Sequence, residues 1–174
     1  ETLLITQNLN AIAQLSCNPA MGGVAKGQIV REIDALGGMS GIVTDQNTMQ
    51  FRMLNRSKGP AMWSPRAQVD NVTFGISWRK QLESVARLQL WQDEVVDLVI
   101  NNGMIEGVIT KIGLKIEAKA VILTNGTFLN GKIHIGENSF ESGPDGVFPS
   151  VKLSETLNRL GIDLIRFKTG TPAR

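Results

Sequence analysis

Apolar residues recur at helical spacing near the start of the chain. Residues 28–36 place Ile29, Ile33 and Leu36 on one stripe. The pair Gly37-Gly38 follows directly, and glycine is the common residue after the last turn of a helix. The pattern therefore predicts a helix over 28–36 that ends at these glycines.

Two further stretches show the same spacing. Residues from about 65 to 85 begin with Pro65, which suits the first turn of a helix. Two apolar rows run along this stretch, formed by Val69, Val72 and Ile76 and by Trp78, Leu82 and Val85. Residues 150–160 predict another helix, with Ser150 as candidate N-cap and Gly161 as stop.

Shorter apolar runs predict strands. Two early runs cover 3–6 and 49–54, and a series of short runs follows from residue 88: 88–91, 95–100, 104–110 and 114–117. Asn101-Asn102-Gly103 is typical of a type I′ hairpin turn, because asparagine and glycine accept positive φ angles. Lys111-Ile112-Gly113 indicates the next turn. The series therefore predicts a small antiparallel β-meander.

Residues 120–124 read AVILT, the uninterrupted apolar composition of a strand buried on both faces. This strand would end at Asn125-Gly126, and residues 162–167 predict a last strand. Strands and helices thus alternate around a meander. Two-dinucleotide-binding flavoproteins have this α/β layout, in which a meander replaces one crossover helix.

Composition narrows the class of protein only in part. The chain has 174 residues, 42% of them hydrophobic and 20% charged, which is typical of a soluble globular domain with a core. A net charge of +2 excludes a histone-like tail and still allows a local basic surface. One cysteine excludes an internal disulfide framework, and no apolar run approaches the ~20 residues of a membrane span. We expect a cytoplasmic protein.

The single cysteine, Cys17, is the most informative residue for chemistry. It heads a glycine-rich loop with Lys26 close by, ahead of the predicted helix over 28–36. Helix N-terminal amides and a nearby cation both stabilise a thiolate, so a reactive cysteine would be placed here. The alternative is a small buried apolar residue, a common fate of a lone cysteine.

Two glycine turns are candidates for a cofactor. Gly22 and Gly23, before the first predicted helix, suit a phosphate cradle of backbone N–H groups, although an ordinary turn has the same composition. Neither a Walker A loop nor a Gly-x-Gly-x-x-Gly fingerprint occurs. Asn125 and Gly126 follow the predicted buried strand, where ligands bind in open α/β sheets. A strand-end turn that needs glycine is the alternative there.

A basic stretch around Trp63 suits contact with nucleic acid. Arg56, Lys58 and Arg66 flank this aromatic residue, a combination that fits a phosphate or a stacked base, although such charges are more often simply solvated. His134 is the only histidine and has no second histidine or cysteine near it, so a zinc site is not expected.

Six segments together resemble the bacterial tRNA uridine 5-carboxymethylaminomethyl modification enzymes of the MnmG, or GidA, family. The resemblance covers essentially the whole chain. The segments are SCNPAMGGVAK (16–26), REIDALGG (31–38), QFRMLNRSKGP (50–60), PRAQ (65–68), LTNGTFLNGKIHIG (123–136) and KTGTPAR (168–174). Trp63 departs from the family pattern, which has a more basic loop there, so the role of this loop in tRNA contact is in doubt.

The resemblance implies a glutathione-reductase-like, two-dinucleotide-binding FAD domain that is incomplete at both ends. We expect residues 1–150 to be a partial FAD-binding domain, with the meander at about 88–118. Residues 151–174 would begin an inserted region leading to the NADH-binding part. The family's first strand with its pyrophosphate loop, its second cysteine and its helical C-terminal region would lie outside this chain. We therefore expect the chain alone to be inactive.

The resemblance also implies a reaction. The enzyme would use FAD, NADH and methylenetetrahydrofolate to add an aminomethyl or carboxymethylaminomethyl group to C5 of the tRNA wobble uridine. Glycine or ammonium would supply the nitrogen. A homodimer would work with an MnmE-type GTPase. The alternatives are a related folate- and flavin-dependent tRNA uracil methyltransferase and a catalytically silent module that binds tRNA or docks the GTPase.

Site residues follow from strand positions and from the family match. Val95 would hold the adenine end of FAD through its backbone, Gly126 would let the chain pass close to the cofactor, and Ser150 would offer its hydroxyl or N–H. Cys17 is the candidate for addition to uridine C6 or for another thiol role beside the flavin. Asn125, Gly22 and Gly23 complete the cofactor set, and the basic residues around Trp63 are the tRNA contacts.

Overall fold

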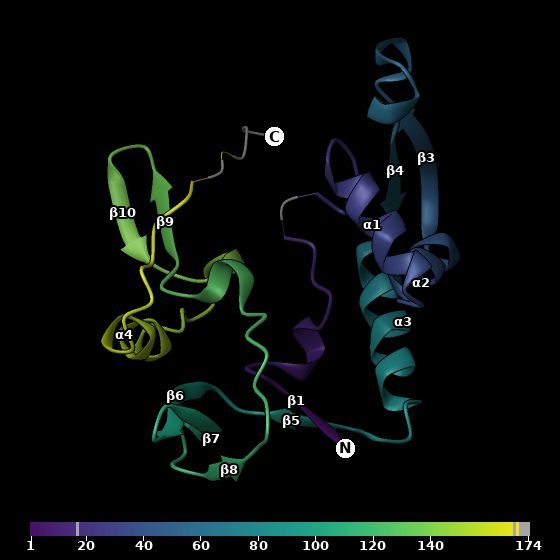
Figure 1. The fold of residues 1–174 in the computed structure, drawn as a ribbon. Helices are drawn as coiled ribbons and strands as arrows, with labels where there is room; N and C mark the ends of the chain where they lie inside the picture. The colour runs from purple at the N-terminus through teal and green to yellow at the C-terminus, as the bar shows by residue number, and fades with distance from the viewer. Residues whose placement is uncertain (17, 169, 171–174) are drawn as a thin grey trace. The chain divides into compact units, whose positions relative to one another are not determined.

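The computed structural model describes residues 1–16, 18–168 and 170, so Cys17 and most of the final KTGTPAR run lie outside the described residues. The chain divides into two compact units, which are described separately (Figure 1). The first unit contains Glu1–Leu3 and Asn8–Leu90, and the second contains Leu4–Gln7 and Trp91–Arg174.

The first unit is built on an antiparallel sheet in the order β2-β4-β3. These strands are β2 (Ala20–Gly22), β4 (Ser64–Val69) and β3 (Thr48–Leu54). Its helices are α1 (Lys26–Ala35), α2 (Ser40–Gln46) and α3 (Asn71–Glu83), with short 3-10 helices at Leu9–Ala11, Arg56–Lys58 and Pro60–Met62. Val43, Val69 and Phe74 form the buried core where α2, β4 and α3 meet.

The predicted helix over 65–85 is wrong in its first part. Residues up to Val69 form β4, which pairs with β2 on one side and with β3 on the other. The Asp70 side chain then accepts the N–H of Thr73 at 2.7 Å and caps α3. The buried row of α3 is also different from the predicted rows, because Phe74 is 1% exposed while Val72 and Ile76 face outward.

Other helix boundaries follow the sequence signals. The predicted helix over 28–36 is confirmed as α1, and Gly37 takes a φ of 85° just after it. The helix α2 and the short strand β2 of this unit were not predicted, and neither were the two strands at Lys132–Ile135 and Asn138–Glu141 in the second unit. The apolar stripe of α1 faces outward, with Ile29 and Leu36 both exposed.

The second unit contains the predicted meander, whose strands β6 (Val95–Asn101), β7 (Met104–Thr110) and β8 (Lys115–Glu117) are antiparallel. Asn102 and Gly103 have φ angles of 48° and 77°, which confirms the predicted turn. A hairpin of β9 (Lys132–Ile135) and β10 (Asn138–Glu141) follows, then α4 (Lys152–Arg159), with 3-10 helices at Gly126–Phe128 and Pro144–Gly146.

The strands β1 (Thr2–Thr6) and β5 (Leu88–Gln92) pair in a two-stranded sheet, as their apolar composition predicts for strands. The N–H of Thr2 donates to Arg87 O at 2.8 Å, and the N–H of Asp93 donates to Thr6 O at 3.0 Å. Both bonds advance along the two strands in the same direction, so this pair is parallel.

Two predicted strands are absent. Residues 120–124 belong to no sheet, and Ile122 is 85% exposed. Residues 162–167 also lie outside any strand, with Ile165 and Phe167 exposed. A strand buried on both faces needs a neighbour on each side, and the described residues place none beside either run. No helix in the described part of the chain has the length and apolar character to cross a bilayer.

Candidate cofactor site

Two distant segments of the second unit lie side by side and bring three predicted cofactor residues together. The N–H of Ser150 donates to Phe128 O, and the N–H of Asn130 donates to Ser150 O, each at 2.9 Å. Leu129 and Ser150 thereby form a parallel bridge. The bridge holds Ser150 beside the 3-10 turn that contains Gly126 and follows Asn125.

The Ser150 side chain is buried and unpartnered. The residue is 5% exposed, and its Oγ has no hydrogen-bond partner among the described residues. The predicted N-cap role is wrong, because α4 begins at Lys152, with Val151 at the cap and no side-chain cap bond. A buried hydroxyl without a partner is unfavourable and uncommon, so this group suits a hydrogen bond to a ligand.

The predicted turn at Asn125-Gly126 forms even though the strand before it does not. Gly126 has a φ of 51°, and a Cβ added there would meet nothing within 4 Å. Asn125 is in the right-handed helical region and precedes the 3-10 turn. The open space above Gly126 leaves room for a ligand to approach the backbone.

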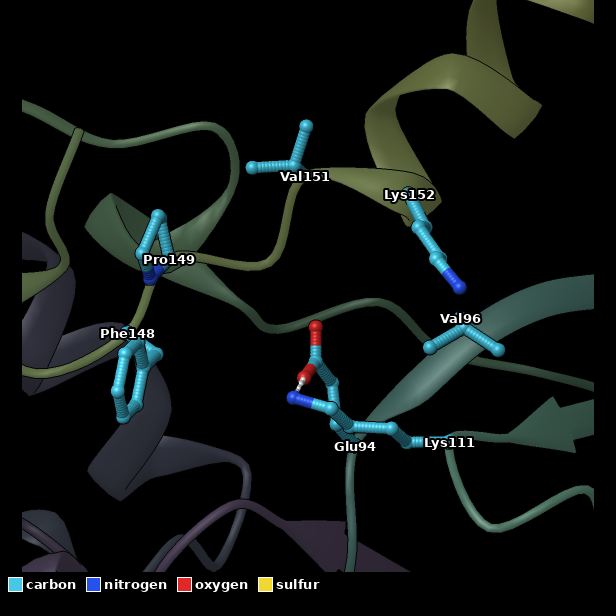
Figure 2. A pocket seen from close by; sticks show the side chains of 7 residues that line it. All are labelled: Glu94, Val96, Lys111, Phe148, Pro149, Val151 and Lys152. Carbon is cyan, nitrogen blue, oxygen red and sulfur yellow. Dashed lines mark hydrogen bonds and ion pairs between the residues drawn. The ribbon is translucent and has the colours of Figure 1, made fainter.

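A pocket of about 190 Å³ lies between the start of β6 and the chain that enters α4 (Figure 2). It is lined by Glu94, Val96, Lys111, Phe148, Pro149, Val151 and Lys152. Val95 lies between two of these lining residues, and so does Ser150. Two predicted FAD contacts that are far apart in sequence therefore each lie between residues that line one pocket, although neither is itself a lining residue.

The pocket combines apolar walls with an ion pair at one edge. Phe148, Pro149 and the two valines supply the apolar surface, the common lining of small-molecule sites. Lys111 Nζ lies 3.1 Å from Glu94 Oε2, as Figure 2 shows, and the Glu94 side chain is only 12% exposed. The N–H of Lys111 also donates to Glu94 O at 2.7 Å, which fixes the pair in place.

Hydrogen bonds lower the pKa of two aspartates, Asp93 and Asp97, that neighbour pocket-lining residues in the chain. Burial alone would raise the pKa of Asp93, but hydrogen bonds from the Thr110 hydroxyl and the Glu94 N–H bring this pKa below its usual value. The pKa of Asp97 is lowered in the same way, because bonds from Thr156, the Leu98 N–H and Arg159 outweigh its burial. Oδ2 of Asp93 is another buried oxygen that has no hydrogen-bond partner within the described part of the chain.

Gly22 and Gly23 lie in the first unit, where their visible role is close packing. Gly22 has a φ of 90°, and a Cβ there would collide with Pro65 O. The N–H of Gly23 donates to the same Pro65 O at 2.8 Å. These glycines let β2 approach β4, and their contact with a cofactor stays a prediction.

The predicted tRNA residues occupy one hairpin of the first unit. Arg56 and Lys58 are exposed on the 3-10 helix after β3, and Trp63 Nε1 donates to Arg56 O at 3.2 Å. Arg66 lies on β4, in register with Arg52 on β3. Arg52 was not predicted, because a cross-strand partner can be inferred only when both strands are recognised, and residues 65–69 were expected to be helical.

His134 lies exposed on β9, away from any candidate metal cluster. In the described ranges, no group of three or more His, Cys, Asp or Glu side chains is placed to hold a metal ion.

Comparisons with known proteins identify the family of this chain. The model of the family "Glucose inhibited division protein A" matches residues 1–174. The tRNA uridine 5-carboxymethylaminomethyl modification enzyme MnmG of Cytophaga hutchinsonii is 57% identical over 174 residues, covering all of this chain and 28% of that protein. The MnmG of Thermodesulfovibrio yellowstonii is 58% identical over the same shares of the two chains.

A solved structure matches as well. GidA of Aquifex aeolicus, in its form I crystal, superposes with a TM-score of 0.90 at 47% identity, covering 98% of this chain and 28% of that one. This likeness confirms the expected α/β dinucleotide-binding fold with its inserted meander. The chain spans 28% of the length of the curated relatives it matches.

Proposed function

Because this chain belongs to the glucose-inhibited division protein A family, we propose that it forms part of a FAD-dependent enzyme that modifies C5 of the wobble uridine of tRNA. The observation that carries the proposal is the Ser150 hydroxyl, which is buried and has no partner among the described residues, and which lies in the chain between two residues that line the pocket, Pro149 and Val151. A flavoprotein needs such a site, and the predicted residues Val95 and Ser150 would supply it here.

The adenine end of FAD would lie at this pocket. The backbone of Val95, at the start of β6, would bond to the base, and Ser150 Oγ would donate to or accept from the cofactor. Gly126 would let the chain pass close to it without a clashing side chain, and Asn125 would lie beside it at the same turn. The apolar walls would exclude water from the base.

Flavin, when bound, supplies reversible transfer of reducing equivalents. We propose that NADH is the reductant and that methylenetetrahydrofolate is the one-carbon donor. Glycine or ammonium would provide the nitrogen of the aminomethyl-type product. The enzyme would act in the cytoplasm as a homodimer together with a GTPase of the MnmE type.

Cys17 would supply the nucleophile. C5 of uridine is weakly nucleophilic until a group adds at C6, and a thiolate suits that addition. The new bond joins Sγ to C6, and the electron pair that moves to C5 attacks the methylene carbon of the folate iminium, whose C=N electrons pass to the folate nitrogen. Loss of the C5 proton and departure of Sγ from C6 restore the ring. The amine nitrogen of glycine or ammonia would then replace the folate nitrogen at the methylene carbon, and tetrahydrofolate would leave with a proton on that nitrogen. A different thiol role beside the flavin is the second possibility for this residue.

The basic hairpin of β3 and β4 would contact tRNA phosphates. Arg56 and Lys58 project from its exposed 3-10 helix, and Arg66 lies opposite Arg52 on the paired strands. Two like charges directly opposite one another destabilise the hairpin when no nucleic acid is bound. A phosphate near them would remove that repulsion, and such contacts position a nucleic acid without reading its sequence.

Purification of the full-length enzyme tests the proposal most directly. We expect a yellow protein with flavin absorbance and, after reaction with tRNA, a wobble uridine whose mass has gained an aminomethyl-type group. A gain of a plain methyl group would instead identify the folate-dependent methyltransferase. A colourless protein that still binds tRNA would identify a silent binding module. The 174-residue chain alone should not turn over.

A further inference from the structure

One carboxylate oxygen in the second unit accepts three donors. Asp97 Oδ1 accepts the Thr156 hydroxyl at 2.7 Å, the Arg159 guanidinium at 2.8 Å and the N–H of Leu98 at 2.9 Å. Thr156 and Arg159 belong to α4, whereas Asp97 belongs to β6. Two of these bonds therefore tie the helix to the strand.

The hydrogen bonds from Thr156 and Arg159 to Asp97 connect the two walls of the pocket. Glu94 and Val96 line it from the β6 side, and Val151 and Lys152 line it from the start of α4. Asp97 follows Val96 directly along the chain, and Thr156 lies one turn of helix beyond Lys152. The spacing between the two walls thus depends on how β6 and α4 are held together.

The contact differs from an ordinary surface ion pair. An exposed pair such as Arg159 with Asp97 contributes little by itself, because solvent screens it. Thr156, however, is 3% exposed, so water cannot easily take the place of the Asp97 carboxylate as acceptor for its hydroxyl. A buried hydroxyl that loses its charged partner is left unsatisfied, and the helix must shift to recover a bond.

We propose that Asp97 is a positioning residue, which through Thr156 sets the distance between β6 and the start of α4 and so places Val95 and Ser150 for the adenosine end of FAD. This inference rests on the proposed flavin site. It goes beyond that site, because the hydrogen bond between Asp97 and Thr156 would control the affinity of the enzyme for FAD without touching the cofactor.

The test uses the full-length enzyme, stripped of flavin and titrated with FAD by fluorescence. Thr156→Val removes the hydroxyl at nearly constant volume, and we expect it to raise the Kd for FAD about tenfold, the loss typical of a hydrogen bond to a charged group. Thr156→Ser keeps the hydroxyl and should restore the wild-type Kd to within about twofold.

Two controls separate positioning from general damage. Glu83→Gln breaks a comparable 2.8 Å ion pair with Arg79 in the first unit and should leave the Kd unchanged. Val43→Ala loosens the buried core of the first unit and should lower the Tm without the loss of FAD affinity seen in Thr156→Val.

Normal FAD binding by Thr156→Val would overturn the positioning role alone. Equal losses in the serine and valine variants would overturn it as well, because the hydroxyl would then not be the cause. A wild-type enzyme that binds no FAD would overturn the proposed function and this inference together, so the two failures are distinguishable.

Discussion

The N–H of Ser150 donates to the carbonyl oxygen of Phe128 at 2.9 Å, and this bond joins two segments more than twenty residues apart. The backbone of Ser150 is thereby satisfied on both sides, since its carbonyl oxygen accepts the N–H of Asn130. Its hydroxyl is not, although it is buried. The backbone groups of Ser150 thus make hydrogen bonds that stabilise the fold, whereas its hydroxyl is available to bond a ligand.

Ser150→Ala should therefore separate binding from stability. Because Oγ has no partner in the described residues, we expect the apo enzyme to keep its free energy of unfolding. The affinity for FAD should fall about tenfold, which corresponds to one lost hydrogen bond. Thermal unfolding of the apo enzyme and a FAD titration measure the two effects.

Ser154→Ala is the matched control for this variant. Ser154 is equally buried, but its Oγ donates to Val151 O at 2.6 Å. We expect this variant to lose about 1 kcal/mol of stability and to retain more of its FAD affinity than Ser150→Ala. The reverse pattern in the two variants would show that the Ser150 hydroxyl serves the fold.

Gly22→Ala should be far more damaging than Gly37→Ala. Both glycines have positive φ angles, 90° and 85°, so each alanine bears the strain of the left-handed region, about 1–2 kcal/mol. Only at Gly22 does the new Cβ also meet a backbone atom, Pro65 O, whereas nothing lies within 4 Å at Gly37. Urea denaturation of both variants gives the difference, and equal losses would mean that β2 can move away from β4.

Sequence signals predicted the turns well because these depend on the local backbone. Asn102, Gly103 and Gly37 needed positive φ, and the residue types alone indicated it. The prediction of a helix over 65–85 was wrong in its first part because the local pattern there fits two structures. Val69 fits a helical row and equally a buried strand position, and the N-cap at Asp70 decides between them.

Contacts between distant residues could not be predicted in this way. Spacing does not show that the chain neighbours of Val95 and Ser150 line one pocket, because that depends on how α4 packs on β6. The resemblance to a family selected both residues without that geometry. The apolar run over 120–124 was predicted from composition alone, and a strand forms only where a neighbour is present to pair with it.

The free energy of unfolding at acid pH should depend on the ionisation of Asp97. Its bonds to Thr156, Leu98 and Arg159 hold its pKa below the value of about 3.9 found in unfolded chains. The carboxylate therefore stabilises the fold fully above that unfolded value, and the contribution is lost as the pH falls through the lower, folded pKa. Asp97→Asn should be less stable than wild type near pH 6.

The difference between Asp97→Asn and wild type should then shrink steadily below about pH 4, as the wild-type carboxylate becomes protonated. Denaturant unfolding of both proteins across the acid range measures it. A difference that stays constant over that range would mean that the charge of Asp97 does not contribute.

Replacing Arg56 and Lys58 together should weaken tRNA binding at all sequences alike. Both side chains are exposed on the hairpin, and phosphate contacts release counterions. The slope of log K against log salt should become shallower by about one per lost contact. Lys80→Ala, which removes an exposed cation from α3, is the control and should leave the slope as it is. An unchanged slope in the double variant would place the tRNA elsewhere.

Cys17→Ser and Cys17→Ala should both abolish uridine modification in the full-length enzyme while leaving FAD bound. Cys17 lies outside the described residues, so the expectation comes from chemistry, because neither an alcohol nor a methyl group adds to C6 of uridine as a thiolate does. Mass spectrometry of tRNA nucleosides and the flavin spectrum report the two properties. If Cys17 is instead a buried apolar residue, alanine should preserve modification and the polar serine should impair stability. Modified tRNA from the alanine variant would therefore remove the thiol from the mechanism.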